Sequence, residues 1–129
     1  MKEIEACAGC VVHSFVPVRD LPPFYWASDI GVWPKQESTS QLDAAACVLP
    51  IVLSDRVQVR ERVDGNGLLY KENDIADLAT SLKNLIDADL RRKMGNIGSA
   101  KVKNLFSWNG IARKRAEDYK QILRQADSQ

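Results

Sequence analysis

The hydrophobic positions of this chain form short continuous runs in its first half and helically spaced stripes in its second half. The runs are apolar and partly β-branched, as in buried strands; they are Val11–Val16, Ile30–Trp33, Ile51–Leu53 and Leu68–Tyr70. Between them, Asp20 is expected to cap a short helix with Pro22 in its first turn. Ser38–Cys47 and Val57–Val63 are also expected to be helical.

The second half of the chain predicts helices. The apolar residues of Ile75–Asp87 fall on one face at a period of 3.6, and Asp74 is well placed as the N-cap. A second stripe begins with Leu90, Met94 and Ile97, where Gly95 and Gly98 are expected to loosen the helix. Ser107 is expected to cap a last helix that extends through Tyr119, Ile122 and Leu123.

Strands that alternate with helices predict an α/β fold in which a parallel sheet is covered on both faces. The strand runs lack a period of two, as a doubly covered sheet requires. A length of 129 residues suits one domain. The expected architecture is a Rossmann-like parallel sheet flanked by helices, with a helical C-terminal tail.

Charge and cysteine content exclude several classes of protein. A net charge of +1 argues against nucleic acid or an anionic membrane as the main partner. The first ten residues include Lys2, Glu3 and Glu5 and no long apolar run, so no export signal is expected. Cys7, Cys10 and Cys47 are interpreted as reduced thiols, and a cytoplasmic location is expected. The two cysteines of Cys7-Ala-Gly-Cys10 have the spacing of a redox motif, but the simpler interpretation is that they are small residues without a redox role. No metal site is predicted, because a second ligand pair could come only from His13 and Cys47.

The stretch from Pro34 to Pro50 carries the candidate chemistry. It follows the strand Ile30–Trp33, and ligands of open parallel sheets bind beyond the carboxyl ends of the strands. Ser38 and Gln41 have the spacing of a capping box, in which Gln41 would reach back to the Ser38 amide. The free amides of the helix start then predict a phosphate site.

Two carboxylates flank this turn. Leu42, Ala45, Ala46 and Leu49 are expected on the core side of the helix. Asp43 falls on another face near Thr39 and Ser40, and Glu37 precedes the helix. Carboxylates accept paired hydrogen bonds from vicinal hydroxyls, so a nucleotide-sugar would fit, with its phosphate on the amides. The alternatives are that Asp43 only complements the helix dipole and that Glu37 is a solvated loop residue.

Several motifs in order resemble a known family. Asp29-Ile-Gly-Val-Trp-Pro34, Glu37-Ser38 and Asp43-Ala-Ala-Ala-Cys47 leading to Leu49-Pro-Ile-Val52 resemble the donor-binding core of retaining GT-B glycosyltransferases. The most similar group is glycosyltransferase family 4, the glycosyl transferases group 1. Glu61-Arg-Val-Asp-Gly-Asn-Gly-Leu-Leu69 and Phe106-Ser-Trp108 resemble further motifs of that family, and the resemblance extends from Val11 to about Leu123.

The resemblance implies roles for individual residues. Glu37 matches the first acid of the family's paired-carboxylate motif, which contacts the donor sugar. The amides of Ser38, Thr39 and Ser40 match the turn that meets the diphosphate, and Asp43 matches the acid that holds the ribose diol. Val12 and His13 lie near where family members frame the base. No cofactor is implied, since the nucleotide diphosphate-sugar is a substrate.

The chain also departs from the family pattern. Five residues separate Glu37 from Asp43 where the family has seven, and Val48 replaces the glycine that ends the helix. A left-handed valine there would cost on the order of 1–2 kcal/mol. The family's glycine-rich turn and its Arg and Lys for the diphosphate do not precede Val11.

The resemblance therefore predicts an incomplete C-terminal domain of a GT-B fold. Residues 1–10 are expected to be the remnant of a preceding helix or linker, and residues 11–129 a partial donor-binding domain. The parent enzyme would transfer a sugar, with retention, to an acceptor glycan, lipid or small molecule held by an N-terminal domain that is missing here. The chain alone is expected to be inactive.

Alternative interpretations stay open. The first is a non-catalytic nucleotide-binding or interaction module that kept the fold, and the second, less favoured, is a related GT-B epimerase. Arg91-Arg92-Lys93 is interpreted as a solvated helix face, with contact between the full enzyme and a membrane surface as the alternative. Trp26 and Trp33 are expected to pack rather than to stack on a base.

Overall fold

The computed structural model describes residues 2–126 of the chain and contains a small parallel sheet. Strands β1 (Gly31–Trp33), β2 (Ile51–Ser54) and β3 (Gly67–Tyr70) lie in the order β1-β2-β3, with Val52 of β2 opposite Val32 and Leu68. The predicted α/β class and parallel sheet are confirmed.

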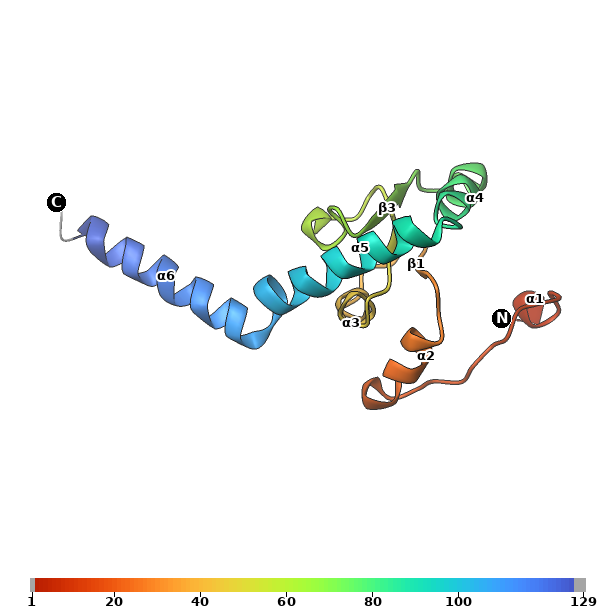
Figure 1. The fold of residues 1–129 in the computed structure, drawn as a ribbon, viewed down its shortest axis with the longest axis horizontal. Helices are drawn as coiled ribbons and strands as arrows, with labels where there is room; N and C mark the ends of the chain where they lie inside the picture. Colours follow the sequence, from red (N-terminus) through yellow and green to blue (C-terminus); the bar gives the residue numbers. More distant parts are fainter. Residues whose placement is uncertain (1, 127–129) are drawn as a thin grey trace.

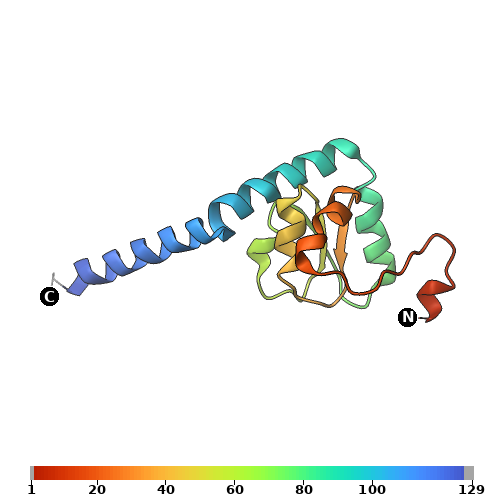
Figure 2. The same cartoon turned by 90° about the horizontal axis from the view of Figure 1, so that it is seen from below.

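Helices surround this sheet and extend beyond it (Figure 1). They are α1 (Lys2–Glu5), α2 (Pro22–Trp26), α3 (Ser40–Ala46), α4 (Ile75–Asn84), α5 (Ala88–Lys101) and α6 (Trp108–Ala126), with 3-10 turns η1 (Val18–Asp20) and η2 (Arg60–Arg62) and a π turn η3 (Val102–Phe106). In both views α6 projects from the body as an arm (Figures 1 and 2). No helix among residues 2–126 is sufficiently long and apolar to cross a bilayer.

The central strand is buried on both faces, as the sequence predicts. On one face, Ile51 and Leu53 pack with Ala44 of α3 and with Leu49. On the other face, the core consists of Val52, Tyr70 and Leu85, against which Leu78, Leu82, Leu90 and Met94 of α4 and α5 pack. Helices therefore cover both faces of β2, which explains its continuous apolar sequence.

The predicted strand Val11–Val16 is wrong. This segment has no regular structure, and Phe15 is 90% exposed. A strand must exchange hydrogen bonds with a neighbour, and among the described residues β1 pairs with β2 alone. The segment instead runs without regular structure from α1 into η1 and α2 (Figures 1 and 2).

The starts of α2 and α3 also differ from expectation. Asp20 lies in η1 and does not cap α2, which has Pro22 in its first turn as predicted but has no side-chain cap. Helix α3 begins at Ser40 and buries Gln41, Ala44 and Ala45, so the predicted core positions Leu42 and Ala46 are only half-buried and exposed, respectively. The buried face is rotated because α5 crosses at Ala45, where a Cβ on Gly98 would lie 3.3 Å from the Ala45 Cβ.

Helices α4 and α6 begin at the predicted caps. The Asp74 carboxylate accepts a hydrogen bond from the Asp77 amide at 3.0 Å, and the Ser107 hydroxyl accepts one from the Gly110 amide at 3.1 Å. Gly95 does not loosen α5. A Cβ at this position would lie 2.0 Å from the Val48 carbonyl oxygen, so the glycine permits α5 to pack on the end of α3.

Candidate functional site

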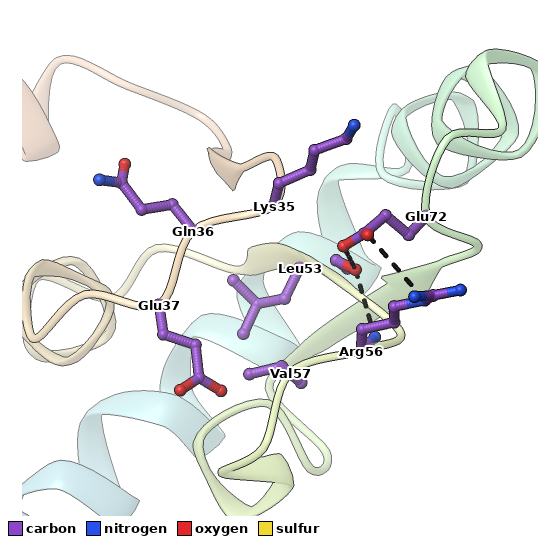
Figure 3. A pocket seen from close by; sticks show the side chains of 8 residues that line it. Lys35, Gln36, Glu37, Leu53, Arg56, Val57 and Glu72 are labelled. Atoms are coloured by element: carbon purple, nitrogen blue, oxygen red, sulfur yellow. Dashed lines mark hydrogen bonds and ion pairs between the residues drawn. The ribbon is translucent and has the colours of Figure 1, made fainter.

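The carboxyl ends of the three parallel strands meet at one edge of the sheet. The turn 34–39 follows β1, the loop 55–59 follows β2 and the turn 71–74 follows β3. Ligands of open parallel sheets bind at this edge. Figure 3 shows side chains from all three connections gathered there.

The turn between β1 and α3 is fixed by polar side chains. Trp33 Nε1 donates to Ser40 Oγ at 3.0 Å, and Ser40 Oγ donates to Ser38 Oγ at 2.8 Å. Gln41 is fully buried, and its Nε2 donates to the Gln36 carbonyl at 3.0 Å. The path from β1 to the helix is therefore held at both its middle and its end.

The predicted capping box is wrong. Gln41 is engaged by Gln36 rather than by the Ser38 amide, and Ser38 Oγ accepts from the Ser40 amide at 3.2 Å. The reason is that α3 begins at Ser40, so Ser38 lies one residue before the N-cap Thr39. Of the three amides predicted to contact phosphate, the Ser40 amide already donates a hydrogen bond to Ser38 Oγ. The amides of Ser38 and Thr39 make no hydrogen bond within residues 2–126.

The Glu37 carboxylate connects this turn to the loop after β2. Its Oε1 accepts hydrogen bonds from the Val59 amide at 3.3 Å and from the Gln58 amide. Its Oε2 makes no hydrogen bond within the part of the chain that the structure describes. Glu37 thus orders a loop at the sheet edge and still presents one carboxylate oxygen to solvent.

Three residues at this edge were not singled out from the sequence. Ser54 Oγ donates to Glu72 Oε2 at 2.8 Å, and Arg56 Nε lies 3.9 Å from Glu72 Oε1 (Figure 3). The rule that placed Glu37 at the end of β1 also applies to the ends of β2 and β3, and it would have identified them.

These residues and the turn Lys35–Glu37, together with the apolar side chains of Leu53 and Val57, line a notch of about 40 Å³, which we call the polar notch. A volume of this size holds roughly one water molecule, whereas ligand pockets measure roughly 300–1,000 Å³. The notch can therefore receive a hydroxyl group, but it does not enclose a whole sugar.

Asp43 lies on a different side of α3. It lines a separate hollow of about 260 Å³ together with Tyr25 and Cys47. Burial raises the pKa of the Tyr25 phenol, and the negative charge of Asp43 raises it further. The pKa of the Cys47 thiol is raised by the same two causes in the same order. Because Glu37 lines the notch and Asp43 lines this hollow, the two acids do not share a cavity.

The remaining predicted site residues, Val12 and His13, lie on the irregular segment before η1. The His13 ring contacts Phe24 edge-on, with ring centroids 5.1 Å apart and planes at 76°. Neither residue lines the notch of Glu37 or the hollow of Asp43. Among residues 2–126, no three His, Cys, Asp or Glu side chains gather into a group that could hold a metal ion. Cys7, Cys10 and Cys47 are free thiols.

Comparisons with known proteins agree with this architecture. The fold matches sucrose-phosphate synthase from Thermosynechococcus elongatus with a TM-score of 0.77 and 23% sequence identity, over 96% of this chain and 33% of that chain. The chain thus spans about a third of the length of that protein, and its fold is that of a GT-B glycosyltransferase domain. The curated protein sequences contain no match. The family model of glycosyl transferases group 1 matches residues 1–88, and the chain belongs to this family.

Proposed function

We propose that this chain binds a nucleotide diphosphate-sugar at the carboxyl edge of its sheet, as the donor-binding part of a retaining glycosyltransferase. The observation that carries the proposal is the Glu37 carboxylate, which is held at this edge in a member of the glycosyl transferases group 1 family and presents its Oε2 to solvent. Such an oxygen accepts hydrogen bonds from sugar hydroxyls.

The donor would lie across the start of α3. Glu37 and the polar notch are on one side, where the sugar would bind, and Asp43 is on the other, where the ribose diol would bind. The free amides of Ser38 and Thr39 lie between these acids in the chain and would meet the diphosphate, with the dipole of α3 as support.

The nucleoside end is proposed to lie toward α2. The hollow of Asp43 is also lined by Val18 and Pro22, which closely follow the segment that carries Val12 and His13. This neighbourhood supports a nucleoside on the same side, with Val12 and His13 near the base.

The proposed reaction is sugar transfer to an acceptor hydroxyl with retention of anomeric configuration. Catalysis would be largely electrostatic, because the departing diphosphate carries the developing negative charge. Arg56 and Lys35 are the cations that line the notch, and the Arg56 side chain is 77% exposed and thus accessible. Because the chain spans about a third of the sucrose-phosphate synthase chain, binding of an acceptor glycan, lipid or small molecule is proposed for a longer parent protein.

Isothermal titration calorimetry of the chain with a panel of nucleoside diphosphate-sugars tests donor binding. We expect at least one to bind more tightly than its free sugar or free nucleoside, because the linked ligand uses both sides of α3. A panel in which no member binds contradicts the proposal. For the parent enzyme, proton NMR of the anomeric linkage in the product tests retention.

A second candidate is a nucleotide-binding module without transferase activity. Its support is that Glu37 Oε1 is already occupied by the amides of Gln58 and Val59. Both candidates predict donor binding by the chain. Sugar transfer by the parent protein, lost on Glu37→Ala, decides for the enzyme, whereas donor binding without transfer decides for the module.

A further inference from the structure

A second hollow adjoins the polar notch at the carboxyl edge of the sheet. Its volume is about 310 Å³, which falls within the range of roughly 300–1,000 Å³ typical of ligand pockets. Tyr70, only 4% exposed, contributes to it from the end of β3, and Pro34 from the turn after β1. Ile75 and Leu78 line it from the first turns of α4. The hollow is thus apolar and lies where ligands of parallel sheets bind.

Ile75 is the most unusual part of this lining. Its side chain is 85% exposed although it begins a helix whose other large apolar side chains pack on the sheet. An exposed apolar side chain beside an apolar hollow can be buried against a ligand, and removal of its surface from water favours binding.

The notch and the hollow share one cationic lining residue, Lys35. Its ammonium group makes no hydrogen bond or ion pair with any residue from 2 to 126. In Figure 3 the Lys35 side chain points away from Glu37. The carboxylate of Asp74, which also lines the hollow, is engaged by the Asp77 amide at 3.0 Å. The lining therefore carries one cation, Lys35, and one carboxylate, Asp74, whose negative charge faces the N-terminal amides of α4.

The backbone at the rim is left-handed on both sides. Lys35 has a φ of 59° and Asn73 a φ of 68°. Asparagine adopts this region readily, whereas a lysine there costs on the order of 1 kcal/mol or more, and strained residues of this kind collect at ligand-binding sites. One strained residue, Lys35, therefore lies at the rim of the hollow.

We propose that this hollow is a second ligand subsite, which binds an aryl or alkyl group that carries an anionic group. The apolar part lies against Ile75 and Tyr70, and the anionic part pairs with the Lys35 ammonium. We assign the ligand to the acceptor, an assignment that rests on the proposed function. The subsite would place the anionic end of the acceptor beside the notch at which Glu37 would bind a hydroxyl of the donor sugar.

Phenyl phosphate is the probe for this subsite, and NMR titration of the chain provides its dissociation constant and the amides that shift. We expect the shifted amides to surround Lys35 and Ile75. Phenyl phosphate should bind more tightly than either inorganic phosphate or phenol, because it alone uses both the cation and the apolar wall. No detectable binding of phenyl phosphate overturns the proposal.

Matched variants separate the site from general surface effects. Ile75→Ser and Lys35→Gln should each weaken phenyl phosphate binding by roughly tenfold. The controls are Ile86→Ser, which replaces a 73% exposed isoleucine beyond the other end of α4, and Lys83→Gln near that end. Both controls should leave the affinity unchanged, and equal affinity in Ile75→Ser and Ile86→Ser contradicts the proposed site.

The same samples are titrated with nucleoside diphosphate-sugars, so that the two proposals can fail separately. Donor binding without phenyl phosphate binding removes the subsite and leaves the proposed function. Phenyl phosphate binding without donor binding keeps the subsite but removes its assignment to an acceptor.

Discussion

The Glu37 carboxylate accepts a hydrogen bond from the Val59 amide at 3.3 Å, and so joins the turn after β1 to the loop after β2. The same oxygen also accepts from the Gln58 amide. This contact gives Glu37 a structural role in addition to its proposed role toward the donor sugar. The two roles can be separated by substitution.

Glu37→Ala should weaken donor binding by about 1–3 kcal/mol, because a sugar hydroxyl loses its acceptor. It should also lower the free energy of unfolding by about 1–3 kcal/mol, because two loop amides lose theirs. Glu37→Gln keeps an oxygen for the amides and should retain most of the stability. Calorimetry and urea denaturation measure the two quantities. Unchanged donor affinity in Glu37→Ala would remove the sugar contact from the proposal.

Asp43→Ala should remove a preference for ribose. A carboxylate that holds a vicinal diol makes two hydrogen bonds, and a 2′-deoxy donor offers only one of the hydroxyls. The unmodified chain should therefore bind the ribose form of a donor more tightly than its 2′-deoxy form, by about 1–3 kcal/mol. In Asp43→Ala the two affinities should become equal. A ribose preference that survives this substitution places the diol elsewhere.

Cys47 should react faster with a thiol reagent after Asp43→Asn. Burial and then the charge of Asp43 raise the pKa of the thiol, so the reactive thiolate is scarce near neutral pH. Removal of the negative charge lowers this pKa toward its ordinary value and raises the thiolate fraction. The rate is measured in a Cys7→Ser, Cys10→Ser background, in which Cys47 alone can react. Asp89→Asn, at an exposed residue of α5, is the control and should leave the rate unchanged.

Gly95→Ala should destabilise the fold by about 1–3 kcal/mol or more. The added Cβ would lie 2.0 Å from the Val48 carbonyl oxygen and 2.8 Å from its carbonyl carbon, and backbone cannot yield as a flexible side chain does. Asn96→Ala, at the next and exposed position of α5, should be neutral or slightly stabilising. Equal melting temperatures for the two variants would contradict the close packing of α5 on α3.

Part of the site could be predicted from local sequence alone. Pro34 ends the apolar run of β1, and a polar turn with Glu37 follows at the carboxyl edge. The caps Asp74 and Ser107 were also predictable, since a cap depends on residues within one helical turn. The left-handed Val48, with φ of 66°, was anticipated because the family has glycine at this position.

Other features depend on contacts between distant parts of the chain. Gln41 turns inward to the Gln36 carbonyl instead of capping the helix, and Glu37 binds the loop at Gln58 and Val59. The separation of Glu37 and Asp43 into two cavities follows from how α3 packs against α2 and the sheet.

The sequence by itself determined the class of the sheet, the central buried strand and the position of the acidic turn, because hydrophobic period and helix caps act over a few residues. The tertiary structure alone decided that Val11–Val16 is no strand, since a strand requires a neighbouring partner. It also decided that Gly95 fits against Val48, and that the side chains of Ser54 and Arg56 contact Glu72. These contacts join residues that lie far apart in the chain, and no local sequence pattern specifies them.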